Sequence, residues 1–184
     1  MDDVQAIRRL KRGDMGGLES LMVRYQVRAT RAAFLITHDE AVAQDVVQET
    51  FIRIYQRVRQ FNESHPFEPY LMRSIINASL NAVRGNARIV SFDSDSTGLE
   101  NLLDLAASVE SQIEFVQLQR KILDVLSKLS PRQRAVIVQR YYLDMSEQDM
   151  ALALDVAPGT VKWLLNAARE RLRQLLGQKG EPNE

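Results

Sequence analysis

Apolar residues recur every three or four positions along most of this chain, which is the spacing that puts side chains on one face of an α-helix. In the first half this spacing predicts four helices, over about residues 4–10, 15–36, 40–58 and 67–84. Thr37 and Glu40 have the spacing of a capping box at the start of the third helix. The fourth helix is expected to turn five side chains inward: Phe67, Leu71, Ile75, Ala78 and Ala82. The first half is therefore predicted to be a small helical bundle.

The helical spacing stops after residue 84 and resumes near residue 109. Between them, a polar run rich in serine and aspartate predicts a flexible linker with a short helix near residues 99–107. The next helix is expected to bury Ile113, Val116, Ile122, Val125 and Leu129, and Ser130 with Pro131 opens another that extends to residue 142. The sequence therefore predicts an all-α protein with two small helical domains, 1–88 and 113–178, joined by a flexible linker over 89–112.

Residues 146–165 combine a short helix, a tight turn and the start of a longer helix, which is the helix-turn-helix arrangement. Ser146 and Asp149 have capping-box spacing, and Pro158 fits the first turn of the second helix. That helix is expected to bury Val161, Leu165, Ala168, Leu172 and Leu176. Its other side presents Lys162, Trp163, Asn166, Arg169 and Arg173 to solvent or DNA. Taken alone, a helical bundle with a solvated basic face has the same pattern.

Composition excludes several classes of protein. The 184 residues include no cysteine and two histidines, so we expect no disulfide, no metal site and no cofactor. No catalytic grouping stands in a recognisable motif, so the chain is not expected to be an enzyme. No apolar run approaches the roughly 20 residues that span a bilayer, and the N-terminus is acidic, unlike a signal segment. We therefore expect a cytoplasmic protein with no membrane insertion.

Charge is unevenly distributed, although 24 basic and 24 acidic residues give a formal net charge of zero. Residues 128–179 hold nine basic and five acidic side chains, and nine minus five leaves this domain basic by four. Residues 89–115 hold six acidic side chains and no lysine or arginine. The second domain is therefore predicted to attract DNA, and the acidic linker is predicted to avoid it.

Two polar helix faces in the first domain are further candidates for binding. The outward face of the third helix presents Asp45, Gln48, Glu49 and Arg53, although a solvated face with a Glu49 to Arg53 ion pair is an equal alternative. In the fourth helix, basic and amide residues follow one another at steps of three or four, with no acid among them: Arg73, Asn77, Asn81, Arg84 and Arg88. A merely soluble stripe is the alternative, but arginines mixed with amides suit phosphates and exposed base edges.

These motifs together resemble the bacterial sigma factors of the extracytoplasmic-function (ECF) group over nearly the whole chain. Residues 45–55, Asp-Val-Val-Gln-Glu-Thr-Phe-Ile-Arg-Ile-Tyr, are similar to the region-two helix that docks on core RNA polymerase. The stripe from Arg73 to Arg88 is similar to the part of region two that binds the minus-10 element. Residues 129–134, Leu-Ser-Pro-Arg-Gln-Arg, with the helix-turn-helix, resemble region four, which reads the minus-35 element.

The resemblance implies an alternative sigma factor whose partners are core RNA polymerase, promoter DNA and an anti-sigma factor. It assigns core binding to Asp45, Gln48, Glu49 and Arg53 and minus-10 binding to Arg73, Asn77, Asn81, Arg84 and Arg88. It assigns minus-35 binding to Thr160, Lys162, Trp163, Asn166, Arg169 and Arg173. It also implies that region two captures an unpaired base. The alternative is a helix-turn-helix regulator that binds duplex DNA without polymerase.

This chain departs from the usual pattern of the family in its helix-turn-helix. Asp155 stands in the turn where glycine is usual, and aspartate tolerates a left-handed backbone better than most residues. Leu164 and Ala167 offer no hydrogen bond at positions where the family tends to contact bases. The ring of Trp163 either packs over the domain edge or is an exposed anchor for DNA or a partner. Direct reading of the minus-35 element is therefore expected to be weaker than in relatives.

Overall fold

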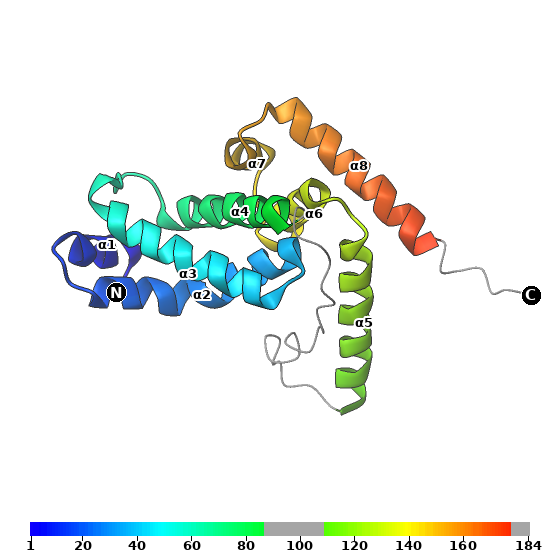
Figure 1. Cartoon of the computed structure of the whole chain (residues 1–184), viewed down its shortest axis with the longest axis horizontal. Coiled ribbons are helices and arrows are strands. Elements are labelled where there is room, and N and C mark those ends of the chain that lie inside the picture. Colours follow the sequence, from blue (N-terminus) through cyan, green and yellow to red (C-terminus); the bar gives the residue numbers. More distant parts are fainter. Residues whose placement is uncertain (87–108, 178–184) are drawn as a thin grey trace, which may run out of the picture. The chain divides into compact units, whose positions relative to one another are not determined.

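The structure is a computed structural model that describes residues 1–86 and 109–177. In these ranges the regular elements are all helices: α1 (Asp3–Lys11), α2 (Gly16–Thr37), α3 (Glu40–Arg57), the 3-10 helix η1 (Val58–Gln60), α4 (Phe67–Asn86), α5 (Val109–Ser127), α6 (Pro131–Ile137), the π-helix η3 (Val138–Tyr142), α7 (Glu147–Leu154) and α8 (Pro158–Gly177). They form two compact units, α1 to α4 and α5 to α8 (Figure 1).

The predicted all-α class is thus confirmed. Most of the predicted acidic linker lies outside the described residues, and so does the predicted short helix near residues 99–107. The last four residues of the range predicted as linker begin α5. The exact domain boundaries, 1–88, 89–112 and 113–178, stay a prediction.

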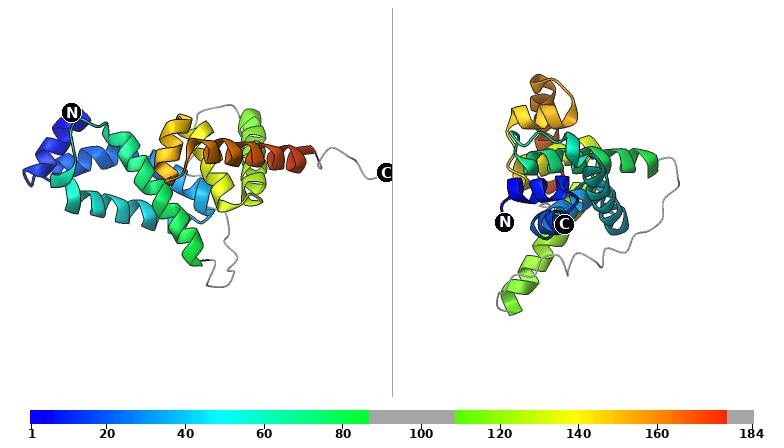
Figure 2. Two further views of the ribbon diagram at one scale, coloured as in Figure 1. Left: turned by 90° about the horizontal axis from the view of Figure 1, so that it is seen from above. Right: turned by 90° about the vertical axis from the view of Figure 1, so that its left-hand side faces the viewer.

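The core of the first unit lies between α2, α3 and α4, which pack against one another (Figure 2). At the centre of α2, Ala29, Ala32 and Ala33 are completely buried. Their small side chains let the neighbouring helices approach closely, and larger apolar residues from α3 and α4 fill the remaining space. These include Val46, Val47, Phe51, Ile54, Leu71, Ile75 and Ile76. One side of α3 therefore faces the core, and its other side faces solvent.

Helix α1 is held against α2 at Gly17. A Cβ atom at this position would lie 2.2 Å from the carbonyl oxygen of Ala6 and 2.9 Å from the amide nitrogen of Leu10. Both neighbours are backbone atoms, so a side chain at residue 17 would force the two helices apart. Glycine is therefore required for the observed packing of α1 on α2.

The start of α3 differs from the prediction. Asp39, and not Thr37, is the N-cap residue, because its carboxylate accepts a hydrogen bond from the amide of Val42 at 2.9 Å. Thr37 is the last residue of α2, and His38 after it has a left-handed backbone with φ of 58°. The predicted capping box of Thr37 and Glu40 is therefore wrong, since Thr37 belongs to the preceding helix.

Helix α4 buries a broader face than the sequence predicted. Phe67, Leu71 and Ile75 are buried as expected, whereas Ala78 and Ala82 are only half-buried. The additional buried residues are Met72, Ile76, Ser79 and Leu80. Because α4 packs on both α2 and α3, it needs two adjoining apolar stripes in place of one.

In the second unit, α8 packs against α5, α6 and α7. The predicted cap before α6 is confirmed: Ser130 accepts a hydrogen bond from the amide of Gln133 at 3.3 Å, and the Gln133 side chain accepts one from the amide of Ser130 at 3.0 Å. After α6 the helix widens into the π-turn of η3, where the amide of Leu143 donates to the carbonyl of Val138 at 3.0 Å. The predicted continuous helix to residue 142 is therefore interrupted by a wider turn after Ile137.

Helix α5 exposes part of its predicted inner face. Ile122 is 48% exposed, and Leu118 one turn earlier is 53% exposed, whereas Val125, Leu126 and Leu129 are buried. The burial of α5 is thus concentrated near its junction with α6. The prediction that Ile122 lies in the core is wrong, because helical spacing alone does not show where along a helix its neighbours end.

Candidate functional site

The polar face of α3 is exposed along its whole length. Asp45, Gln48, Glu49 and Arg53 all lie on the surface, while the opposite face is buried through Val46, Val47, Thr50 and Ile54. The proposed ion pair between Glu49 and Arg53 does not form in the described part of the chain. These side chains are therefore available to a partner.

Two apolar side chains stand on the exposed side of α3, where the sequence predicts a polar face. Ile52 is 51% exposed and Tyr55 is 41% exposed. Ile52 follows Gln48 by four residues and Glu49 by three, so the three side chains are neighbours on the helix surface. The face thus has an apolar middle with a polar border, which is the usual anatomy of a protein interface.

The basic and amide stripe of α4 lies on the surface of the first unit. Arg73, Asn81 and Arg84 are exposed, and Asn77 is half-buried. Arg88 lies outside the described residues. The structure therefore leaves the guanidinium groups at the surface and sets the Asn77 amide deeper.

An aromatic cluster stands at the head of this stripe. The ring of Tyr70 is 5.1 Å from the ring of Phe61 and 6.4 Å from that of Phe67, measured between centroids, and Phe67 in turn contacts Tyr25 at 5.7 Å. Tyr70 packs against other rings but remains 37% exposed. It is therefore an interfacial tyrosine, with one part in the core and one part at the surface.

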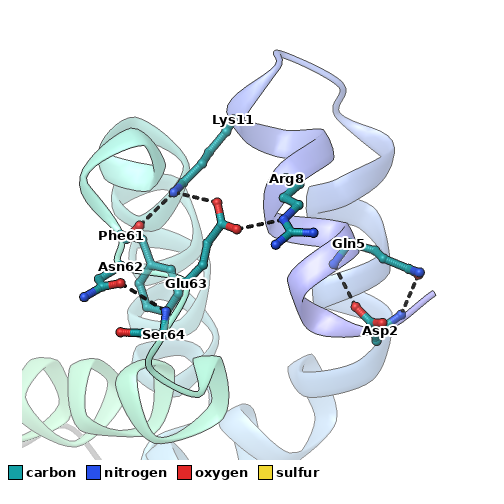
Figure 3. Close-up of polar contacts among 8 residues, drawn as sticks. All are labelled: Asp2, Gln5, Arg8, Lys11, Phe61, Asn62, Glu63 and Ser64. Atoms are coloured by element: carbon teal, nitrogen blue, oxygen red, sulfur yellow. Dashed lines mark hydrogen bonds and ion pairs between the residues drawn. The ribbon is translucent and has the colours of Figure 1, made fainter.

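The loop that leads into α4 is fastened to α1 by charged side chains (Figure 3). Glu63 accepts hydrogen bonds from Nε of Arg8 at 2.8 Å and from Nζ of Lys11 at 3.0 Å. Lys11 also donates to the carbonyl of Phe61 at 2.8 Å. The hydrogen bonds from Arg8 and Lys11 lower the pKa of Glu63 below its ordinary value. This cluster holds the loop before α4 against α1, and no local signal predicts it because its members are about 50 residues apart.

The helix-turn-helix has the predicted start, turn and second helix. Asp155 adopts a left-handed backbone, with φ of 54° and ψ of 51°, and ends α7 as expected. Ser146 is the N-cap of α7, and its hydroxyl accepts the amide of Asp149 at 3.1 Å. The Asp149 carboxylate accepts a hydrogen bond from the Ser146 hydroxyl at 2.6 Å, and not from the Ser146 amide, so the reciprocal capping box is not completed. The turn therefore forms with aspartate in place of glycine.

The outward side of α8 carries most of the residues that were predicted to meet DNA. Lys162, Trp163, Asn166 and Arg173 are exposed, and Thr160 and Arg169 are half-buried. Trp163 is 67% exposed, so its ring is not packed away over the domain edge. Lys162 lies 3.8 Å from Glu147, and Arg173 pairs with Glu170 at 3.0 Å. The face is therefore basic but partly neutralised by its own neighbours.

Two residues of α8 lie on the side opposite to the one predicted. Leu164 is 7% exposed and belongs to the core with Val161, Leu165 and Ala168. Leu176, which was expected inside, is 51% exposed. Leu164 therefore cannot be a position that faces bases. The predicted stripe of α8 has steps of four, three, four and four residues, which average more than the 3.6 residues of a helical turn, so the stripe drifts away from the buried face and leaves Leu176 exposed.

Among the described residues, no helix has the length and apolar character needed to cross a membrane. Within the same residues, no three acidic, histidine or cysteine side chains come together as metal ligands.

Comparison with known proteins places these faces in context. The sigma-70 region 2 family matches residues 21–89, and the sigma-70 region 4 family matches residues 119–172. The ECF RNA polymerase sigma factor SigW of Bacillus subtilis is 26% identical over 176 residues, covering 92% of this chain and 94% of SigW. The RNA polymerase sigma-E factor of Streptomyces avermitilis is 32% identical over 146 residues, covering 79% of this chain and 77% of that factor.

Solved structures share the fold. The sigma factor RpoE from Bartonella quintana, in complex with the anti-sigma factor NepR, has a TM-score of 0.68 at 21% identity and covers 86% of this chain and 96% of its own. CnrH, in complex with the cytosolic domain of CnrY, has a TM-score of 0.66 at 23% identity. The match covers 96% of this chain and 97% of CnrH.

A helical unit with a basic stripe and a second unit with a helix-turn-helix define a DNA-binding transcription protein. The matches are more specific: this chain belongs to the RNA polymerase sigma factors, in the ECF group. It is an alternative sigma factor, a transcription initiation factor that binds core RNA polymerase and directs promoter-specific initiation.

Proposed function

We propose that three helix faces carry out this function. The exposed face of α3 binds core RNA polymerase, the stripe of α4 binds the minus-10 element, and the outward side of α8 binds the minus-35 element. The observation that carries the proposal is that none of the described residues assigned to these faces is buried in either core. The protein works in the cytoplasm beside RNA polymerase and has no catalytic activity of its own.

On α3, the polymerase contact is built around an apolar middle. Ile52 and Tyr55 are exposed among Gln48, Glu49 and Arg53, which supply the polar border. Interfaces draw most of their affinity from a few central side chains, while the bordering polar residues exclude water and fix the orientation. Charge on this border therefore governs specificity, and the two apolar residues govern affinity.

The two DNA faces depend on the polymerase. Each face offers few cations, and the chain as a whole has no net charge, so each face alone releases few counterions from DNA. When polymerase holds both units at a fixed spacing, binding by one raises the effective concentration of the other. Selective binding is therefore expected in the complex and not in the free protein.

On α4, the two kinds of side chain have different tasks. Arg73 and Arg84 are exposed and suit phosphate oxygens, which bear no sequence information. Asn77 and Asn81 can hydrogen-bond base edges once the strands separate. Extruding a base costs a few kcal/mol, so capture of an unpaired base by this unit helps to keep the promoter open.

On α8, direct base reading rests on fewer groups than the length of the helix implies. Leu164 is in the core, so Lys162 and Asn166 are the exposed hydrogen-bonding groups nearest to Trp163. A good bidentate contact contributes about 1 to 3 kcal/mol of discrimination between bases. Trp163 adds an apolar surface that fits thymine methyl groups. Minus-35 recognition is therefore expected to be modest and to depend on this ring.

An anti-sigma factor is the expected regulator. The similar solved structures are the sigma factor RpoE in complex with the anti-sigma factor NepR and CnrH in complex with the cytosolic domain of CnrY. The apolar side chains of Leu118 and Ile122 on α5 are exposed in the free chain. A protein partner that covers the binding faces of this chain would keep it from polymerase until it is released.

Charge reversal at Glu49 tests the proposed polymerase face. Glu49→Arg should weaken binding to core RNA polymerase, because it places a cation on the border of the interface and leaves the buried face of α3 intact. The matched control is Glu19→Arg, which reverses an exposed acid on α2 away from this face. Unchanged core affinity of Glu49→Arg, with an unchanged circular dichroism spectrum, would refute the assignment of α3.

A further inference from the structure

Tyr141 and Arg169 form a pair that joins η3 to the middle of α8. Nε of Arg169 donates a hydrogen bond to the Tyr141 hydroxyl at 3.0 Å, and the guanidinium carbon lies 6.0 Å from the centre of the tyrosine ring. The hydrogen bond, with the ring beside it, limits the freedom of the guanidinium to swing. Arg169 is therefore positioned before any ligand arrives.

The pair is directed toward solvent. Tyr141 is 63% exposed, and Arg169 is half-buried beside it. The tyrosine oxygen accepts from Arg169, so its own hydrogen is free to donate, and no acceptor for it is present in the described part of the chain. Arg169 uses only Nε in this bond and keeps its two terminal nitrogens as donors. Together they offer a neutral O–H and a charged N–H fork side by side.

Tyr141 lies on the outer side of its helix. Gln139 is completely buried and Leu143 is buried, while Tyr141 between them lies at the surface. Residues four apart share one helix face, and the residue midway between them lies on the opposite face. The contact between Tyr141 and Arg169 joins residues 28 positions apart, so helical spacing alone does not predict it.

The position of the pair on the unit decides what it can bind. Arg169 follows Asn166 by three residues and Lys162 by seven, and Arg173 follows it by four, so all four lie along one side of α8. Arg173 and Lys162 each have an acidic neighbour, Glu170 and Glu147, whereas Arg169 has a neutral one. Within the described residues, no ion pair neutralises the charge of Arg169 in the middle of the face.

We propose that Tyr141 and Arg169 together bind one backbone phosphate of promoter DNA, which rests on the proposed function of α8. Tyr141 acts in two ways: it holds the guanidinium in place, and it donates its hydroxyl to a second oxygen of the same phosphate. Phosphate fits because it is anionic and offers several acceptor oxygens to a set of donors. The contact fixes the register of α8 on the duplex and carries no base preference.

The test compares Tyr141→Phe, Arg169→Ala and the double variant in the full-length chain. Tyr141→Phe keeps the ring and removes only the hydroxyl, so the fold is preserved. The control is Arg171→Ala, which removes an exposed cation of α8 that bonds only to Gln174 in the described structure.

One arm of the test measures binding of the free protein to a mixed-sequence duplex at low salt. The other measures holoenzyme binding to the promoter fragment that the wild-type holoenzyme enriches from genomic DNA.

In both arms Tyr141→Phe should weaken binding about three- to tenfold, which is within the range for the net loss of one ordinary hydrogen bond. Arg169→Ala should lower the slope of log affinity against log salt by about 0.9, the value for one phosphate contact. Because the two residues share one phosphate, their effects should not add in the double variant. The ranking of promoter sequences should stay unchanged.

Wild-type affinity of Tyr141→Phe in both arms, or strictly additive losses in the double variant, would overturn the inference. So would a loss in Arg171→Ala as large as that in Tyr141→Phe, since it would show a general effect of charge or of the helix. A wild-type holoenzyme that enriches no fragment would contradict the function of the protein instead. The free-protein arm would still decide whether Tyr141 and Arg169 bind phosphate.

Discussion

Truncating Ile52 should weaken the contact between this sigma factor and core RNA polymerase. The side chain is 51% exposed in the free protein, so about half of its surface remains to be buried by a partner. Complete burial of such a side chain contributes about 1.5 to 3 kcal/mol, and half of that is about 0.8 to 1.5 kcal/mol. Ile52→Ala should therefore raise the dissociation constant roughly four- to twelvefold.

The matched control for this prediction is Val27→Ala. Val27 is also β-branched and 53% exposed, but it lies on α2 and outside the proposed face. Competition binding to core polymerase, with a fluorescent wild-type chain as tracer, measures both variants under the same conditions. Equal affinity of Ile52→Ala and the wild type would refute the apolar middle of the interface. An equal loss in Val27→Ala would show that the effect is not local to α3.

Three other outcomes are expected. Arg84→Ala should slow opening of every promoter and reduce the salt dependence of opening, whereas Asn81→Ala should change which promoter sequences open. A fluorescent base in the minus-10 element measures opening in both variants. If neither variant affects opening, the α4 stripe is only a solvated face. Gly17→Ala should lower the free energy of unfolding by about 1 to 3 kcal/mol. Gly85→Ala should not lower it, because a Cβ atom at residue 85 would have open space around it. Similar melting curves for the two variants would contradict the tight contact of α1 with α2. Trp163→Ala should reduce promoter or partner binding more than stability, and simple unfolding of the variant would show that the ring is structural.

Local signals in the sequence were sufficient for the helices and most of their ends. Ser130 with Pro131 gives the start of α6, and Asp155 gives the left-handed end of α7, because capping and turn chemistry depend on adjacent residues. The exposed face of α3 follows from its strict helical spacing against a single buried side. These features require no knowledge of what lies elsewhere in the chain.

Features that depend on distant neighbours were predicted less well. The width of the buried face of α4 depends on its packing against two helices, and the exposure of Ile122 depends on where the neighbours of α5 end. The bonds from Arg8 and Lys11 to Glu63 join segments that only the fold brings together. The bond between Tyr141 and Arg169 likewise joins residues 28 positions apart, so no local signal predicts it.

Run-off transcription with purified core RNA polymerase and genomic promoter fragments tests the central claim most directly. Core enzyme and this protein together should produce discrete transcripts from a small set of fragments, and neither should do so alone. Specific binding to duplex DNA by the free protein, with no transcripts when core enzyme is added, would contradict the account. That result would instead indicate an independent helix-turn-helix regulator.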